Sequence, residues 1–159
     1  MNTLKLQNDL IKAANNRDEK YKEFNGFYVK HEYETIIGPN RSQAFVIPNE
    51  QLYINLEKVF NGKEVPTFEN VLYKIETDES YSVLKDTGII EQRTIGKKKI
   101  QLLVFENTAL NEKIYLDKKL FKYYDTKNLV LYGGNCKQPV RVYEDTEFVG
   151  VLAPVWIQD

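Results

Sequence analysis

Short runs of strand-forming residues, separated by turn signals, occupy the last third of the chain. Residues 100–105 are mostly aliphatic and aromatic, and shorter runs of the same kind follow. The pair Gly133-Gly134 and the polar stretch 144–147 supply turns between them. Strands joined by such short connections pair antiparallel, so we expect an antiparallel meander. Its strands are predicted at 100–105, 113–116, 129–132, 139–143 and 148–152, with a short helix at 118–124.

The earlier part of the chain predicts helices and a hairpin. Leu6 and Leu10 recur at helical spacing, and Thr3 precedes them as a candidate N-cap. Gly38, followed by Pro and Asn, indicates a tight turn between two strands. The predicted segments are helices at 4–16 and 50–60 and strands at 27–37, 43–47, 71–76 and 81–84.

Three consecutive lysines follow Gly96, and the sequence predicts that residues 96–99 form the tip of a hairpin. Lysines on such a tip are either solvated surface or contacts to phosphate, which are weak individually and sensitive to salt. The sequence leaves both interpretations open.

Length and charge limit the class of protein. With 159 residues the chain has room for one ordinary domain, which we assign to residues 1–159 with 48–99 as a candidate insertion. Its 22 basic and 23 acidic residues give a formal net charge of -1, so DNA contact would need a local basic face. Cys136 is the only cysteine, which excludes an intrachain disulfide. Because no signal region or membrane-length apolar run is visible, we expect a soluble, cytoplasmic protein without a membrane partner.

Four stretches towards the end of the sequence carry a family pattern. They are Tyr-Leu-Asp-Lys-Lys-Leu-Phe at 115–121, Leu-Val-Leu-Tyr at 129–132, Lys-Gln-Pro-Val-Arg-Val at 137–142 and Phe-Val-Gly-Val-Leu-Ala-Pro-Val at 148–155. In order and spacing they resemble the last domain of the bacterial DNA sliding clamp, the β subunit of DNA polymerase III. Two departures are the extra residue before Pro139 and Ala153, where the family has Met.

The resemblance, which covers residues 115–156, implies a fold and a function. The fold is α+β, a DNA-clamp-like domain with helices on one face of an antiparallel sheet. The function is a non-catalytic role in DNA replication, in which helices present Lys and Arg to phosphates without reading bases. The alternative interpretation of those residues is a solvated helix surface. The residues expected to contact the DNA backbone are Lys5, Lys12, Arg17, Lys118, Lys119 and Lys122.

A clamp also binds short peptides of replication proteins in an apolar pocket near its C-terminus. By the resemblance, the pocket residues are Val151, Ala153, Pro154 and Val155, although the valines also suit an ordinary strand core. Trp156 is either an anchor for a partner or a cover for a core edge. A clamp polypeptide has two or three such domains and this chain has room for one. Either several copies assemble into a homo-oligomer or a single-domain relative, such as a phage encodes, serves another purpose.

Catalysis is not expected. The only histidine, His31, is flanked by Glu32 and Glu34 and could act as a general base, but no nucleophile elbow or phosphate-binding loop accompanies it. Cys136 is far from His31 in the sequence, so we expect an inert thiol. The sequence predicts no metal site and no cofactor.

A further function class is a small protein-interaction module or inhibitor that does not encircle DNA. The chain is rich in Lys, Asn, Ile and Tyr, which is typical of a low-GC bacterium or its phage, where compact inhibitors of host machinery are common. Oligomeric state and DNA binding separate this class from a clamp.

Overall fold

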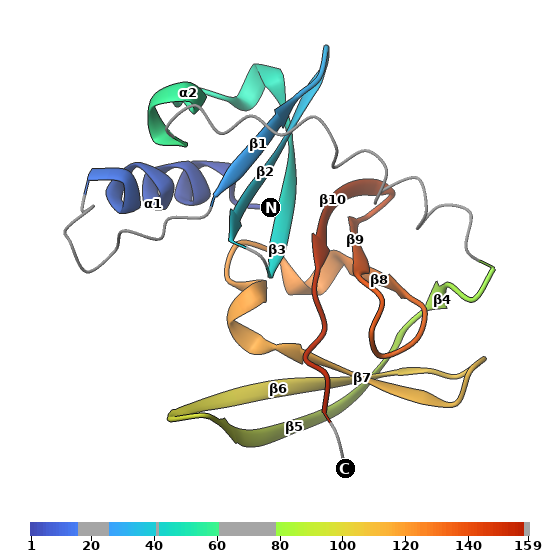
Figure 1. Cartoon of the computed structure of the whole chain (residues 1–159). Coiled ribbons are helices and arrows are strands. Elements are labelled where there is room, and N and C mark those ends of the chain that lie inside the picture. The colour runs from blue at the N-terminus through green and yellow to red at the C-terminus, as the bar shows by residue number, and fades with distance from the viewer. Residues whose placement is uncertain (16–25, 41, 61–78, 158–159) are drawn as a thin grey trace.

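Two antiparallel sheets and two α-helices make up residues 1–15, 26–40, 42–60 and 79–157, which the computed structural model describes. The expectation of an α+β architecture built on antiparallel sheet is confirmed. The larger sheet has the strand order β1-β2-β3-β10-β9-β8-β4, and the smaller has the order β5-β6-β7 (Figure 1). The strands are β1 (Phe27–Lys30), β2 (Glu34–Asn40), β3 (Gln43–Pro48), β4 (Ser82–Val83), β5 (Lys85–Ile95), β6 (Lys98–Asn107), β7 (Glu112–Asp117), β8 (Leu129–Gly133), β9 (Val140–Glu144) and β10 (Glu147–Leu152). The helices are α1 (Thr3–Asn15) and α2 (Leu56–Val59), with 3-10 turns η2 (Asn49–Gln51), η3 (Lys118–Phe121) and η4 (Thr126–Asn128).

The larger sheet joins strands from opposite parts of the sequence. β10 pairs antiparallel with β3, with Gly150 opposite Phe45 and Val151 opposite Ala44 (Figure 1). A side chain at Gly150 would place its Cβ 2.2 Å from the Tyr124 hydroxyl and 2.7 Å from the Ala44 carbonyl oxygen. Glycine therefore lets the buried Tyr124 ring lie against the centre of this sheet.

One hydrophobic core serves both sheets and both helices. Leu6 and Leu10 of α1 and Val59 of α2 are buried in the same cluster as Phe45 of β3 and Ile114 of β7. The helices therefore share their core with the face of the larger sheet that Phe45 occupies. Alternate residues of β1, β2 and β3 form a second cluster on the other face, as the strand period requires. Its buried members are Val29, Ile36, Ala44 and Val46.

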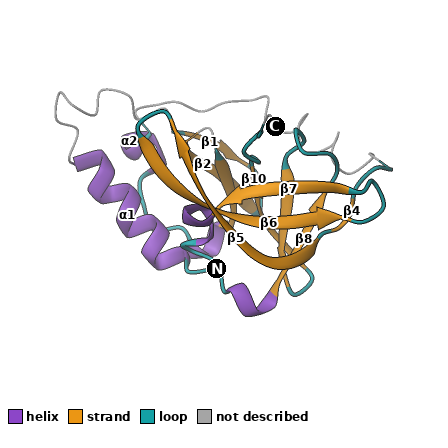
Figure 2. Cartoon of the chain, turned by 90° about the horizontal axis from the view of Figure 1, so that it is seen from below, coloured by secondary structure: helices purple, strands orange, loops and turns teal. Residues whose placement is uncertain are grey.

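The smaller sheet packs beneath the larger one, and Figure 2 shows it from below with β5 at the edge opposite β7. Phe105 of β6 stacks on Phe121 of η3 with ring centroids 6.2 Å apart. Beyond β10 the chain reaches β7, where the Val155 N–H donates to the Tyr115 carbonyl at 2.8 Å. This bridge and the shared core connect the two sheets.

Asn107, at the end of β6, is a fully buried polar junction between the sheets. Its Nδ2 donates to the carbonyls of Ser80, Gly133 and Gly134 at 3.0–3.2 Å. Its Oδ1 accepts from the Ser82 hydroxyl at 2.9 Å and from two backbone N–H groups of the following turn. Every polar atom of the side chain is paired. Asn107 therefore holds the start of β4 against the ends of β6 and β8.

The N-cap of the N-terminal helix lies one residue earlier than predicted. The Asn2 side-chain oxygen accepts the Lys5 N–H at 3.0 Å, so Asn2 is the N-cap and Thr3 lies inside α1. Gln7, which the apolar spacing does not reveal, is completely buried and donates to the Gln51 carbonyl at 2.9 Å. This contact fastens α1 to η2.

The strand predicted at 27–37 is wrong, because the chain turns back at 31–33 to form the β1–β2 hairpin. The His31 N–H donates to the Glu34 carbonyl at 2.9 Å. The Asn49 amide donates to the carbonyls of His31 and Glu32 at 2.9 and 3.0 Å, which holds the turn from outside. Residues of strand-forming type alternate in the same phase before and after this turn, so the sequence pattern resembles one continuous strand.

The tight turn predicted at 38–40 is also wrong, because these residues continue β2. Gly38 lies opposite Phe27, whose ring would be 2.2 Å from a Cβ at this position. The register with β3 shifts between Ile37 and Asn40, and the Asn40 side chain accepts the Ser42 N–H at 2.8 Å. The glycine therefore serves close packing on a neighbouring strand, and the chain reverses after Asn40.

The helix predicted at 50–60 is two short pieces, η2 and α2, separated by extended residues. Asn55 interrupts the helical pattern, since its side chain accepts the Lys58 N–H at 3.1 Å and caps α2. Similarly, the helix predicted at 118–124 is the 3-10 turn η3. The strands from β6 to β10 lie within two residues of their predicted bounds, whereas β5 was not predicted as a strand.

Residues 48–99, set apart in the sequence as a candidate insertion, contribute to both sheets. Their described part includes β4, which pairs with β8 of the larger sheet, and β5 of the smaller one. The strand predicted at 71–76 lies outside the described residues.

Candidate nucleic-acid interface

Three neighbouring elements carry the lysines of the candidate site: α1, the η3 turn and the β5–β6 hairpin. The Asn2 N–H, at the start of α1, donates to the Tyr123 carbonyl just after η3 at 2.7 Å. On its other side η3 packs on β6 through the stacked rings of Phe121 and Phe105. η3 therefore lies between the helix and the hairpin (Figure 1).

On α1, Lys5, Asp9 and Lys12 lie at spacings of four and three residues, which places them along one side of the helix. Asp9 accepts a hydrogen bond from the Tyr123 hydroxyl at 2.6 Å, so this side faces the η3 turn. Both lysines are exposed. The side of α1 that faces the η3 turn therefore carries two exposed lysines and one aspartate.

Lys122 joins the contact between α1 and η3. Its Nζ lies 3.1 Å from Asp9 Oδ2 and 5.4 Å from the centroid of the Tyr123 ring. The hydrogen bond from Tyr123 lowers the pKa of Asp9, burial opposes this shift, and Lys122 adds to it. Burial and the Asp9 carboxylate together raise the pKa of Tyr123 well above its usual range. Asp9 therefore stays ionised near neutral pH and offsets one positive charge of this surface.

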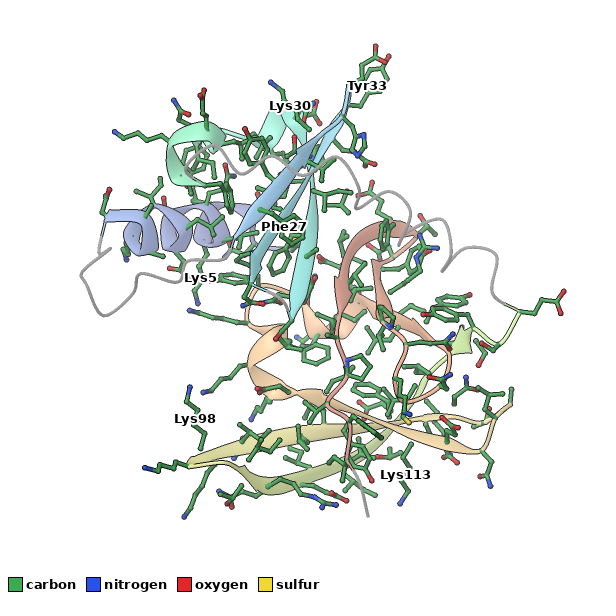
Figure 3. The ribbon with its side chains drawn as sticks, in the orientation of Figure 1. Lys5, Phe27, Lys30, Tyr33, Lys98 and Lys113 are labelled. Atoms are coloured by element: carbon green, nitrogen blue, oxygen red, sulfur yellow. The ribbon has the colours of Figure 1, made fainter. Side chains whose placement is uncertain are left out.

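The hairpin supplies further lysines at its tip. Gly96 has φ +63°, a conformation that suits the first position of a two-residue turn, and Lys97 completes it. Lys97, Lys98 and Lys99 are all exposed, and the predicted hairpin tip is confirmed. Figure 3 shows Lys5 on the underside of α1 and Lys98 at the hairpin tip, on the same side of the molecule.

We call this surface the lysine face. On η3, Lys118 and Lys119 are exposed, and the Asp117 carboxylate accepts the Lys119 N–H at 3.0 Å as the N-cap. Arg17, also predicted to contact DNA, lies outside the described residues. Figure 3 places Lys30 and Lys113 away from this surface, so they serve as reference lysines. We use the name for the exposed lysines of α1, of η3 with the residue after it, and of the hairpin tip: Lys5, Lys12, Lys97, Lys98, Lys99, Lys118, Lys119 and Lys122.

The residues predicted to form a peptide pocket follow one another from the larger sheet to the smaller. Val151 is buried within β10, and the Ala153 N–H donates to the Ser42 carbonyl at 2.8 Å. Pro154 is half-buried, and Val155 makes the bridge to β7. Their backbone therefore holds the two sheets together, whatever their side chains bind.

Trp156, next in the chain, is 55% exposed. The Lys137 ammonium lies 4.3 Å from its ring centroid, at a distance typical of a cation–π contact. The two residues form an aromatic and cationic spot on the surface near the predicted pocket.

On the outer face of β9 and β10, several aromatic rings surround an arginine, a cluster that the sequence motifs did not predict. Arg141 is buried, and its guanidinium carbon lies 4.3 Å from the Phe148 ring centroid and 5.4 Å from that of Tyr143. Tyr143 packs in turn against Tyr132. The alternation of Arg141 and Tyr143 with buried valines was a signal that could have placed them on this face.

The structure places His31 in the turn between β1 and β2 and Cys136 beside the Glu112 carboxylate. The Cys136 N–H donates to the Glu112 carboxylate at 2.9 Å, and the thiol is half-buried. Across residues 1–15, 26–40, 42–60 and 79–157, no three His, Cys, Asp or Glu side chains gather as metal ligands would. A cavity of about 340 Å³ beside the β9–β10 turn is acidic, which disfavours phosphate there; its lining includes Glu144, Asp145 and Glu147.

Comparison with protein-family models, with curated proteins and with solved structures finds no match to this chain. Within the described ranges, no helix is both long enough and apolar enough to cross a bilayer. What the lysine face can bind therefore follows from its own geometry and charge.

Proposed function

We propose that this chain is a non-catalytic, DNA-clamp-like protein associated with replication, and that it holds duplex DNA by its phosphate backbone on the lysine face. The observation that carries the proposal is that Lys5 of α1 and Lys98 of the hairpin tip lie on one side of the molecule, and that Lys122, just after η3, contacts Asp9 of α1. These elements are far apart in the sequence, and their contacts bring them together.

The chemistry of the lysine face suits backbone contact better than base recognition. Lysine presents a flexible, strongly hydrated point charge, whereas bidentate base recognition usually employs Arg, Asn or Gln. Contacts from several lysines release counterions from DNA and make affinity fall steeply with salt. A nearly neutral chain with one basic face attracts DNA on that side alone.

The resemblance of residues 115–156 to a clamp domain supports a role in DNA replication. An antiparallel α+β fold is compatible with that resemblance. A ring around DNA requires several copies of a single-domain chain. Peptides of replication proteins would bind near Val151, Ala153, Pro154 and Val155, beside the exposed Trp156.

A second candidate function is a phage or bacterial interaction module that does not encircle DNA. The exposed Trp156 under Lys137 favours it, because aromatic residues often anchor protein partners. This candidate predicts partner binding that is lost with Trp156→Ala and no salt-dependent DNA binding.

Fluorescence anisotropy with a duplex of random sequence tests the leading proposal. If five to eight lysines contact phosphates, log Kd against log salt should have a slope of magnitude about 4 to 7. The triple variant Lys5→Glu, Lys12→Glu, Lys98→Glu should abolish binding. The matched variant Lys30→Glu, Lys58→Glu, Lys113→Glu changes net charge equally on exposed residues outside the lysine face and should retain most of the affinity. Equal losses in the two variants would contradict a localised site.

A further inference from the structure

The outer edge of β5 presents a long strand without a strand partner among the described residues. β5 runs from Lys85 to Ile95 and pairs with β6 alone in the described ranges. Ile89, Ile90 and Ile95 are 50%, 54% and 50% exposed. A long edge with exposed aliphatic side chains is a template for pairing with another strand. The other edge of the same sheet, on β7, already has the bridge to Val155.

The hairpin register shows which backbone groups point outward. Ile95 and Lys98 flank the two-residue turn, so they form a hydrogen-bonded pair. Because such pairs alternate along an antiparallel ladder, the backbone groups of Glu91 and Arg93 also point towards β6. Those of the even-numbered residues point away from β6. The outward residues are Ile90, Gln92 and Thr94.

We propose that β5 pairs antiparallel with β5 of a second copy of this chain, about a twofold axis through Gln92. In that register Glu91 lies opposite Arg93 of the second copy, and Arg93 lies opposite its Glu91. Ile89 lies opposite Ile95 in the same way. The segment 89–95 is thus complementary to itself, as an interface with twofold symmetry requires.

Charge selects this register over its neighbours. An axis through Glu91 would set the two Glu91 carboxylates against each other, and an axis through Arg93 would do the same to the two guanidinium groups. Directly opposed like charges destabilise a strand pair, whereas opposite charges and aliphatic pairs stabilise it. Only the axis at Gln92 pairs both charges with their opposites.

The hydrogen-bond pattern agrees with the same axis. It makes Gln92 pair with itself and Ile90 pair with Thr94, and these are the residues whose N–H and C=O groups point outward. Glu91 and Arg93 then occupy the non-hydrogen-bonded positions, where opposing side chains are closest. Within one copy Arg93 already donates to Glu91 at 3.2 Å. A guanidinium has five N–H donors, so a network of two arginines and two glutamates can form across the axis.

Sedimentation equilibrium of the full chain without DNA tests the pairing independently of the proposed function. We expect the mass of a dimer for the wild type. Glu91→Arg places Arg opposite Arg twice, and Arg93→Glu places Glu opposite Glu twice, so each variant should raise the dimer dissociation constant about tenfold or more. An equimolar mixture of the two variants restores both opposite-charge pairs and should form a heterodimer.

Two further variants complete the design. The double variant Glu91→Arg, Arg93→Glu keeps the pairs with their polarity exchanged and should dimerise like the wild type. Lys58→Glu changes the charge on α2, outside this edge, and should leave the mass unchanged. Recovery in the mixture also shows that each single variant is folded. A monomeric wild type, or single variants that remain dimeric, would overturn the proposal and leave the β5 edge to another polypeptide.

Discussion

The Tyr123 hydroxyl donates a 2.6 Å hydrogen bond to the Asp9 carboxylate, and this contact joins the turn after η3 to the N-terminal helix. Lys122 pairs with the same carboxylate at 3.1 Å. The two bonds fix the spacing between two of the three elements that carry the lysine face. A change at Tyr123 or Asp9 should therefore affect stability first and DNA binding second.

Tyr123→Phe removes the donor while it keeps the ring against Phe45. We expect a loss of about 1 kcal/mol in unfolding free energy, since Asp9 is left with Lys122 and solvent as partners. Urea unfolding followed by circular dichroism measures it. Tyr33→Phe removes a hydroxyl that is on a 79% exposed residue, and it should change stability by much less.

The same contact should give the protein a characteristic acid response. Because the folded-state pKa of Asp9 lies below its usual value, its ionised form stabilises the fold at neutral pH. That stabilisation is lost as pH falls through the folded-state pKa. The advantage of the wild type over Asp9→Asn in unfolding free energy should therefore shrink from about pH 5 downwards. An advantage that grows in acid would show that Asp9 is not held ionised in the folded state.

Asn107→Ala should be among the more damaging single changes in the described part of the chain. It removes the Asn107 amide from the buried carbonyls of Gly133 and Gly134. A loss of about 3 kcal/mol or more is expected, because each orphaned buried group costs about 1–3 kcal/mol. Thr108→Ala, at the exposed neighbour, is the control, and thermal unfolding of both variants gives the comparison.

Gly150→Ala should destabilise the larger sheet by about 2 kcal/mol through overpacking against Tyr124 and Ala44. The buried Tyr124 hydroxyl has no hydrogen-bond partner among the described residues, so Tyr124→Phe alone should cost less than about 1 kcal/mol. In the double variant, removal of the hydroxyl should reduce the cost of the alanine. Strict additivity in urea unfolding would show that Tyr124 moves aside without help.

Neutralising the hairpin tip tests its share of DNA binding. Replacement of Lys97, Lys98 and Lys99 by Gln should reduce the magnitude of the salt slope by about 1 for each phosphate that the tip no longer binds. The anisotropy titration across salt concentrations provides the slope. The same substitutions at Lys30, Lys58 and Lys113 should leave it unchanged.

The C-terminal meander could be predicted because each strand is a compact run of strand formers between turn signals. The same applies to the hairpin tip, where Gly96 and the following lysines mark the reversal. The turn at 31–33 could not be predicted this way, since Asn49, distant in sequence, supplies the hydrogen bonds that hold it. Gly38 shows a related limit, because its close neighbour is a ring on another strand.

The lysines of α1 and η3 were predicted as one group from a family resemblance, and the structure places both elements beside each other. The contacts of Tyr123 and Lys122 with Asp9 join residues more than a hundred positions apart, which no local pattern encodes. The burial of Gln7 and Asn107 escaped prediction for a similar reason. Both are polar side chains whose partners come from other elements.

The place of β10 between β3 and β9 has a consequence for protein synthesis. The ribosome makes β3 long before β10, so the inner edge of the β1–β3 unit stays open while most of the chain is produced. A nascent chain interrupted before Glu147 has two partial sheets with no strand to join them. Such truncated chains should be captured by other exposed strands or by chaperones, whereas the completed chain closes both edges with a single strand.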